Sequence, residues 1–506
     1  MSHHLRPYQL ETLDAVRSHY VNGLQSVLIV APTGAGKTVI AAAITLSAKT
    51  NGTRVLFLAH RKELIEQASK KLAASGIVHG IISAQYGSKY AKPRARVQIA
   101  SVQTLARREN IDLLQFGLVI IDEAHHATAS QYRKIMDRCG KAWRLGLTAT
   151  AYRADGTGLG DLFDDFHQVA TVEQLQENNF LVRTRVFAGQ KLDLSGVRNT
   201  AGDYNEKDLD KAINNAKLVG NIVHEWMEHG AGRTTVVFAC TVAHSQAIVE
   251  QFVAAGIAAE HLDGAMRTED RSAVLKRLAT GETTVVSNCA VLTEGWDLPQ
   301  CSCVILARPT QSRGLWKQMV GRGMRPAKDK DDCLILDHAG CTHQHGFVED
   351  EDQVDLACGL KRIKEAKVIL CDACGEALRH WVPECPNCGA ALTAPPEEPE
   401  QTTIAEDGDG PKLPEVDEDQ RLIQIKRDEH RCGEFARLVE VAQKRGYSPI
   451  WANRKFKDSV GNWPTAADQA TSPWKTAWRK DPVTGQRECY WSNPDDLFAQ
   501  ALERSA

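Results

Sequence analysis

Residues 31–38 have the types and spacing of a phosphate-binding loop. An apolar, strand-like run at residues 27–30 precedes them, and a helix-like stretch follows, as such a loop requires. Small residues let backbone N–H groups approach phosphate oxygens, and the positive end of the following helix favours the anion. Lys37 would lie on the β- and γ-phosphates of a nucleotide, and Thr38 would offer its hydroxyl to Mg²⁺. A glycine turn without a ligand is the plainer alternative. The residues expected at the phosphates are Ala31, Pro32, Thr33, Gly34, Ala35, Gly36, Lys37 and Thr38.

Two adjacent carboxylates, Asp122 and Glu123, follow a buried apolar run at residues 118–121. Open α/β sheets build their sites at the carboxyl ends of parallel strands, so this position suits a catalytic pair. We expect Asp122 to hold Mg²⁺ and Glu123 to orient and deprotonate an attacking water. An acidic helix start is the alternative, but the upstream phosphate loop favours the catalytic interpretation.

Four cysteines form two Cys-x₂-Cys pairs, Cys371 with Cys374 and Cys385 with Cys388, and glycine follows each pair. Four thiolates suit a closed tetrahedral Zn²⁺ site, and glycine permits the tight turn that points both sulfurs inward. Since four thiolates complete the coordination, we expect a structural rather than a catalytic metal. A redox pair, or iron in place of zinc, is the alternative.

Apolar runs alternate with amphipathic stretches, a pattern that predicts an α/β protein with parallel sheets. The first set of expected strands comprises residues 27–30, 55–58, 97–100, 118–121 and 145–147. The second set comprises residues 236–239, 284–287, 304–306 and 334–336. Two tandem sheet domains of similar size are therefore expected.

The chain of 506 residues is too long for one core. It divides into six expected segments. In order, these are a first sheet domain at 1–185, a connector at 186–214, a second sheet domain at 215–345, a helical connection with the cysteine knuckle (371–388) at 346–392, an acidic linker at 393–420 and a basic, tryptophan-rich domain at 421–506.

Composition excludes several classes of protein. A hydrophobic content of 43% and a charged content of 25% are those of an ordinary globular chain. The sequence shows no export signal and no apolar run of the ~18 residues that cross a bilayer, so we expect a cytoplasmic protein without a membrane partner. Fourteen cysteines in such a chain argue against a disulfide framework.

Charge is unevenly distributed along the chain. The net charge of −3 includes ten acidic residues and one lysine within residues 397–419, so the remainder is positive and nucleic acid is not excluded. Residues 421–480 carry thirteen basic residues against six acidic ones, and five of the ten tryptophans lie in the last 56 residues. This tail suits stacking on single strands or docking of a protein partner, unless its tryptophans form the core of a small domain.

From residue 5 to about 345 the chain resembles the superfamily 2 helicases of the DEAH-box type. The segments that carry the resemblance, in the family's order, are residues 31–38, 122–125, 148–150, 293–297 and 318–325. The resemblance implies two RecA-like domains that hydrolyse ATP with Mg²⁺. Ala31 departs from the general loop pattern, which has glycine there.

The resemblance also implies roles for residues outside the two motifs already described. Residues 148–150 would couple the ATP site to domain movement. Arginine fingers would stabilise negative charge on the γ-phosphate oxygens in the transition state, although a basic surface helix is the alternative for that segment. The residues added to the site are Arg6 and Gln9 at the adenine, Gly295 and Asp297 at the ribose or the closing cleft, and Gln318, Arg322 and Arg325 at the γ-phosphate.

Residues 59–64, 101–105 and 238–241 resemble the family's strand-contacting motifs, where hydroxyls and backbone N–H groups suit phosphate contacts. The cysteine module and the tail, with residues 447–452 and 461–464, resemble the RadD group of bacterial DNA-repair helicases and related phage proteins. That resemblance implies single-stranded or branched DNA as substrate, and a single-strand-binding or recombination protein as a partner of the C-terminal region.

Other functions stay open at this point. The motor motifs are shared with RNA-remodelling ATPases, so RNA is an alternative substrate. A protein that uses ATP only as a switch and recruits partners without unwinding is a second alternative. A motor subunit of a restriction system is disfavoured, because the sequence shows no convincing nuclease or methyltransferase motif.

Overall fold

The computed structural model describes two compact units, Met1–Pro396 and Glu397–Ala506. The described residues are 5–393, apart from 128–129, 154–155, 190–191, 193, 201–202, 214–215, 294, 353, 357–358 and 361–367, with the backbone of 475–480 and 487–492. In the second unit, β20 (Lys475–Lys480) and β21 (Arg487–Ser492) pair antiparallel. The expected linker and tryptophan-rich domain otherwise lie outside the described residues.

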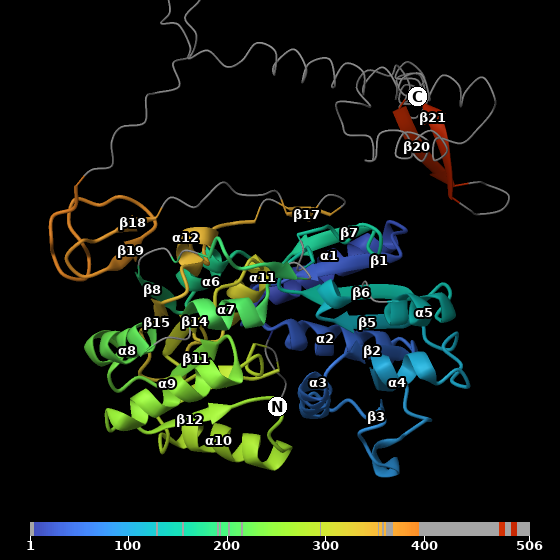
Figure 1. Cartoon of the computed structure of the whole chain (residues 1–506). Helices are drawn as coiled ribbons and strands as arrows, with labels where there is room; N and C mark the ends of the chain where they lie inside the picture. Colours follow the sequence, from blue (N-terminus) through green and yellow to red (C-terminus); the bar gives the residue numbers. More distant parts are fainter. Residues whose placement is uncertain are drawn as a thin grey trace, which may run out of the picture. The chain divides into compact units, whose positions relative to one another are not determined.

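The first unit contains two parallel-sheet domains, as the sequence predicts (Figure 1). The first sheet has the order β3-β4-β2-β5-β6-β1-β7. Its strands are β1 (Ser26–Val30), β2 (Val55–Ala59), β3 (His79–Ile82), β4 (Val97–Ser101), β5 (Leu118–Asp122), β6 (Trp143–Thr148) and β7 (Asp165–Gln168). All five expected strands are present. The two that were not expected, β3 and β7, are the short edge strands.

Helices cover both faces of this sheet. Alternate residues of β1 point to opposite faces, so Val27 and Ile29 pack in one core cluster and Leu28 and Val30 in another. The first cluster includes side chains of α1 (Pro7–Val21), α2 (Lys37–Thr50) and α3 (Lys62–Ala74). The second includes side chains of α4 (Val102–Arg107) and α5 (Ser130–Arg138).

The second sheet has the order β12-β13-β11-β14-β15-β8-β19-β18. Its strands are β8 (Arg183–Ala188), β11 (Thr235–Ala239), β12 (Ala259–Leu262), β13 (Val285–Cys289), β14 (Cys303–Ala307), β15 (Asp332–Asp337), β18 (Ile369–Leu370) and β19 (Glu376–Leu378). Its helices are α7 (Glu206–Ile213), α8 (Ala216–Glu225), α9 (Val242–Ala254), α10 (Thr268–Thr280), α11 (Arg313–Val320) and α12 (Cys341–His345).

Two expected boundaries differ from the structure. Because β8 pairs in parallel with β15, the boundary at residue 185 falls inside a strand of the second sheet. The expected connector thus holds the end of β8, the hairpin of β9 (Asn199–Thr200) and β10 (Asp203–Tyr204), and α7. Among the described residues of 346–369 none is helical, and β16 (Val354–Asp355) and β17 (Gly359–Leu360) occur there instead.

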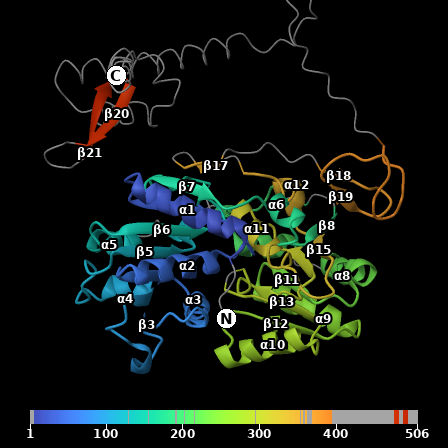
Figure 2. The same ribbon diagram turned by 180° about the vertical axis from the view of Figure 1, so that it is seen from behind.

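Residues 347–360, which we call the interdomain strap, return from the second domain to the first. Figure 2 shows β17 near β7 and α1 of the first domain. The backbone N–H of Gly160 donates to the Leu356 carbonyl at 2.6 Å, and that of Leu360 donates to the Gly156 carbonyl at 2.9 Å. The strap therefore binds the first domain through its backbone.

Asp352 is the polar centre of the interdomain strap. Its carboxylate accepts from the Tyr152 hydroxyl of the first domain at 2.9 Å, and from Arg313 Nε at 2.5 Å and Lys317 Nζ at 2.9 Å on α11. Burial alone would raise the pKa of Asp352, but Lys317 and Arg313 outweigh it, so the pKa lies below its ordinary value. Asp352 thus neutralises two buried cations where both domains meet.

None of the helices in the described part of the chain is long and apolar enough to cross a membrane.

We expect Asp352→Asn to destabilise the first unit by about 3–5 kcal/mol at neutral pH, because it removes the carboxylate that pairs with both Arg313 and Lys317. A folded-state pKa below the ordinary value of about 3.9 means that the carboxylate's contribution is complete above that value and is lost as the pH falls through the folded pKa. Urea unfolding at pH 7 and at about pH 3 measures both effects. Asp331→Asn, at an exposed position, is the control, and equal losses for the two variants would contradict this assignment.

Candidate active site

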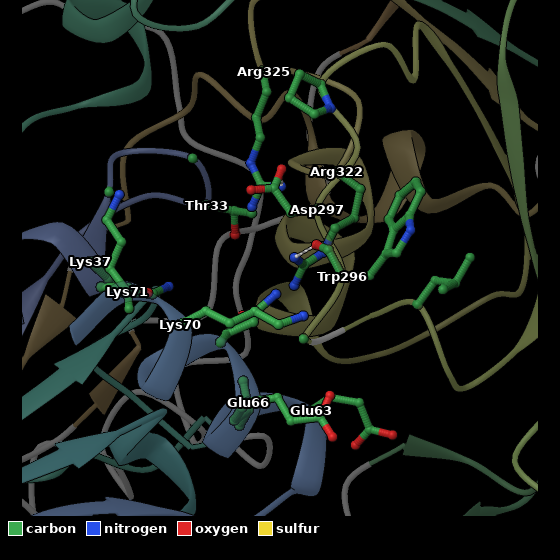
Figure 3. A pocket seen from close by; sticks show the side chains of 18 of the residues that line it. Thr33, Lys37, Glu63, Glu66, Lys70, Lys71, Trp296, Asp297, Arg322 and Arg325 are labelled. Carbon is green, nitrogen blue, oxygen red and sulfur yellow. Dashed lines mark hydrogen bonds and ion pairs between the residues drawn. The ribbon is translucent and has the colours of Figure 1, made fainter. Parts of the chain in front are cut away.

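A cleft of about 1080 Å³ lies between the two sheet domains (Figure 3). The phosphate loop and the end of β5 line it from the first domain, and residues near the ends of β13 and α11 line it from the second. Most expected ATP-site residues meet here. They are Arg6, Gln9, Thr33, Gly34, Gly36, Lys37, Thr38, Asp122, Glu123, Gly295, Asp297, Arg322 and Arg325.

Four expected site residues do not line the cleft. Ala31 and Ala35 are buried residues of the phosphate loop itself, and Gln318 is buried on α11. Pro32 lines a separate, smaller cavity. Other residues of the phosphate loop face the cleft instead.

The phosphate loop depends on two glycines in the left-handed region. Gly34 has a φ of 94° and Gly36 has a φ of 88°, which side chains rarely tolerate. A Cβ on Gly36 would lie 2.7 Å from Gln9 Nε2, and one on Gly34 would lie 2.8 Å from Leu181 Cδ2. Side chains at these positions would therefore strain the backbone and displace the ends of Gln9 and Leu181, and α2 begins directly after the loop at Lys37.

Lys37 and Glu123 face each other at the edge of the phosphate loop. Lys37 Nζ lies 3.7 Å from Glu123 Oε1, and both side chains are nearly buried. Asp122 Oδ1 accepts from the Glu123 backbone N–H at 3.1 Å. Glu123 has a φ of 49°, a left-handed conformation that is unusual outside glycine and that recurs at functional sites. The turn after β5 thus aims one carboxylate at the loop lysine.

Polar contacts link this turn to the second domain. His125 Nδ1 lies 3.5 Å from Glu123 Oε2 and 3.1 Å from Thr148 Oγ1. The Thr148 hydroxyl donates to the Thr150 carbonyl at 2.7 Å. Thr150 in turn lies close to α11, because a Cβ on Gly314 would be 3.3 Å from Thr150 Oγ1. Residues 148–150 therefore lie between the carboxylate pair and α11.

An aromatic ring that sequence analysis missed lies at the expected adenine end. The Arg6 guanidinium stacks 4.3 Å from the centre of the Phe180 ring, and both residues line the cleft. Gln9 Nε2 donates to the Ala35 carbonyl at 3.2 Å, which ties this end to the phosphate loop. Phe180 follows α6 (Val172–Glu177) in a loop without a motif, so no sequence signal marks it as a site residue.

Both expected arginine fingers are held by their own domain. Arg322 donates to the Thr293 carbonyl at 3.1 Å through Nε and to the Trp296 carbonyl at 2.8 Å through Nη1. Arg325 forms an ion pair with Asp297. A Cβ on Gly34 would lie 3.6 Å from Arg325 Cγ, so the stem of Arg325 already approaches the phosphate loop. The two arginines reach the cleft from a single turn after α11.

A neighbouring groove of about 750 Å³ contains the expected strand-contacting motifs of the first domain. Gln103 Nε2 donates to the His60 carbonyl at 2.9 Å and so joins the two motifs. Arg271 of α10 also lines the groove and forms an ion pair with Glu63 at 3.2 Å across the domains. The basic residues that line it are Arg61, Lys62, Arg107, Arg108 and Arg271.

The strand-contacting motif expected in the second domain, residues 238–241, does not line this groove. Thr241 Oγ1 donates to Asp210 Oδ1 of α7 at 2.5 Å and accepts from the His244 N–H at the start of α9. In this structure Thr241 is a helix cap rather than part of the basic groove.

The four expected cysteines form one cluster, with all four sulfurs within 4.8 Å of one another. The Sγ atoms of Cys371 and Cys388 are 3.6 Å apart, and those of Cys374 and Cys385 are 3.7 Å apart. A tetrahedral site with Zn–S bonds of about 2.3 Å has S···S edges of about 3.8 Å. A disulfide needs about 2.05 Å, so these spacings fit four thiolates around one Zn²⁺ and not two disulfides.

The cysteine cluster is joined to the second sheet. Between its two cysteine pairs, β19 pairs antiparallel with β8, so the knuckle extends the sheet edge. Arg185 of β8 donates to Asn387 Oδ1 at 2.6 Å and lies 3.8 Å from the buried Glu376 carboxylate. Loss of the metal should therefore disturb one edge of the second domain.

We predict one Zn²⁺ per chain, and we expect Cys371→Ser with Cys388→Ser to remove it. Elemental analysis of protein purified without chelators measures the metal. Because the phosphate loop belongs to the other sheet, nucleotide binding should persist while residues 369–392 become sensitive to proteolysis. Cys289→Ser, a thiol outside the cluster, is the matched control and should retain full zinc content. Metal-free wild-type protein would refute the site.

Two family models match the chain. The model described as the res subunit of type III restriction enzymes matches residues 2–153, and the helicase conserved C-terminal domain matches residues 215–327. A 51.5 kDa protein of a Lactococcus phage (isolate 7-9) is 32% identical over 72% of this chain and 74% of its own length. IRC3 of Saccharomyces cerevisiae, named as an ATP-dependent helicase, is 32% identical over 67% of this chain.

This chain spans 52% of IRC3, about half its length. Among solved structures, a fragment of an HsdR subunit of a type I restriction enzyme from Vibrio vulnificus YJ016 has a TM-score of 0.54 and 22% identity, covering 71% of this chain and 70% of that one. That likeness supports the fold of two parallel-sheet domains. The matched models and relatives, together with the cleft, show that the chain is an ATP-hydrolysing enzyme of the superfamily 2 helicases.

Proposed function

We propose that the chain is a DNA-dependent ATPase that moves along or remodels DNA, with DNA repair or recombination as its setting. The observation that carries the proposal is the pair of adjacent hollows, one with the ATP-site residues and one lined by basic side chains, which share Lys62, Glu63, Thr268 and Arg271. Two sites with common walls can influence each other through the same side chains.

The chemistry of the first hollow follows from its charges. Lys37 and the N–H groups around Gly34 and Gly36 would bind the phosphates, while Thr38 and Asp122 would hold Mg²⁺. Glu123 would accept a proton from the attacking water once a phosphate takes its place beside Lys37. Arg322 and Arg325 would complete the site from the second domain, so that ATP closes the cleft and hydrolysis loosens it.

The second hollow suits a nucleic-acid backbone rather than base edges. Its lining combines arginines and lysines with Ser101, Gln103 and Thr104, which are groups that bind phosphate and sugar without reading sequence. Such contacts release counterions, so affinity should fall steeply with salt. DNA is proposed over RNA on the resemblance of the cysteine module and tail, and RNA is the second candidate because the motor motifs do not discriminate.

The ATP site is tested with Lys37→Ala and Glu123→Gln. Both variants should lose turnover, the first because phosphate binding weakens and the second because the base is removed while nucleotide still binds. We expect at least a 100-fold lower kcat for Glu123→Gln, since general bases contribute about 10²–10⁴ in rate. Phosphate release and binding of a fluorescent ATP analogue separate the two effects. Wild-type turnover in Glu123→Gln would exclude Glu123 as the base.

The nucleic-acid site is tested with Arg107→Gln and Arg108→Gln. Each variant should bind DNA more weakly, and each lost phosphate contact should reduce the slope of log affinity against log salt by about 0.7–0.9. Arg17→Gln, on the exposed face of α1, is the control. Titrations with single-stranded, duplex, forked and branched DNA, and with RNA of the same sequence, identify the substrate. Stronger ATPase stimulation by RNA would favour the second candidate.

A further inference from the structure

Lys330 has no role in any motif, yet its ammonium group lies in a cage of carbonyl oxygens. Nζ donates to the carbonyls of Pro299 at 2.9 Å and Cys301 at 2.6 Å, on the segment that follows Asp297. The same Nζ lies within hydrogen-bond distance of the carbonyls of Gly323 (2.5 Å) and Arg325 (2.7 Å), on the turn that follows α11, so its three N–H groups are shared among four acceptors. One side chain therefore joins two segments that both line the cleft.

These carbonyls belong to the turn of residues 321–326, which we call the arginine turn because it carries Arg322 and Arg325. Lys330 binds the carbonyls of residues 323 and 325, and the intervening Met324 carbonyl accepts from the Val182 N–H at 2.8 Å. Three consecutive carbonyls of the turn thus have donors from outside it. Two of the three depend on one ammonium group.

Two features that place Lys330 are unfavourable by themselves: backbone strain at the preceding residue and desolvation of the ammonium group. Asp329, directly before it, has a φ of 58°, a left-handed conformation that is strained for a non-glycine residue. Burial lowers the pKa of Lys330 below its ordinary value, so the ammonium is also partly desolvated. The full set of carbonyl acceptors offsets that desolvation, because hydrogen bonds to charged groups are the stronger ones.

We propose that Lys330 is a positioning residue for ATP hydrolysis, which holds the backbone of the arginine turn so that Arg322 and Arg325 meet the γ-phosphate. The proposal rests on the ATP site described above. Lys330 lies on the backbone side of the turn and touches neither the phosphate loop nor the carboxylate pair in the described contacts. Its removal should therefore affect the transition state more than the binding of ATP.

The test compares Lys330→Met with Lys328→Met, an exposed lysine of the same loop. We expect kcat for DNA-stimulated ATP hydrolysis to fall about 10- to 100-fold in Lys330→Met, since a misplacement of about 1 Å can cost that much. KM for ATP and binding of a fluorescent ATP analogue should change less than about threefold, because the phosphate loop is on the other domain. Lys328→Met should match the wild type in all three measurements.

Chemical rescue separates positioning from a general loss of structure. Lys330→Ala removes the atoms of n-propylammonium, so added n-propylammonium should restore part of kcat by refilling the carbonyl cage. Tetramethylammonium has the same charge but no N–H donors, and it should restore nothing. Wild-type kcat in Lys330→Met, or equal effects of the two amines, would overturn the proposal.

If thermal unfolding shows that Lys330→Met does not fold, Lys330→Gln tests the proposal instead. Its neutral amide offers two N–H donors instead of three charged ones, so we expect an intermediate kcat with an unchanged KM for ATP. Wild-type kcat in this variant would overturn the proposal. Turnover by the wild-type chain and its loss in Glu123→Gln test the ATP site independently, so failure of the two ideas can be told apart.

Discussion

Positive charge at the boundary of the two sheet domains is the constraint on which the rest of the structure depends. A motor that binds a triphosphate between domains must bring cations there, and each must have a partner when the phosphate is absent. Lys37 faces Glu123, Arg325 faces Asp297, and Arg322 is bonded to backbone carbonyls. Asp352 likewise forms ion pairs with Arg313 and Lys317. Every partner except Glu123 lies on the second domain or the interdomain strap, so the strap belongs to the motor although no motor motif includes it.

The sequence predicted those elements whose physical signal is local. Central strands such as β1 and β5 are buried on both faces and read as continuous apolar runs, and the phosphate loop is recognisable from its glycines and Lys37 alone. The edge strands β3 and β7 carry polar residues at half-exposed positions, so they lack such a run. The membership of β8 in the second sheet could not be predicted, since it depends on pairing with β15, which lies about 150 residues downstream.

Residues outside the motifs could not be predicted from the sequence for a related reason. Phe180 and Lys330 act through neighbours that are distant in sequence, and neither an aromatic residue nor a lysine in a loop is informative by type. The cysteine pairs were the opposite case, because metal geometry demands a spacing that is visible in sequence. Even so, the attachment of the knuckle to β8 through β19 depends on tertiary pairing, and the spacing of Cys371 and Cys388 says nothing about it.

The two arginines of the arginine turn differ in the interactions that each must break to bind a phosphate. Among the residues that the structure describes, Arg325 pairs with Asp297, whose side chain is 56% exposed, so water can compensate the carboxylate when the arginine moves. Arg322 is nearly buried, and its bonds to the Thr293 and Trp296 carbonyls would leave unsatisfied buried acceptors if they broke. Arg325 can therefore exchange Asp297 for a phosphate at a lower free-energy cost than Arg322 can leave its carbonyl partners. Because Arg322 also holds the Thr293 and Trp296 carbonyls, its position and theirs are coupled, and both arginines would depend on the backbone of the arginine turn to reach a phosphate.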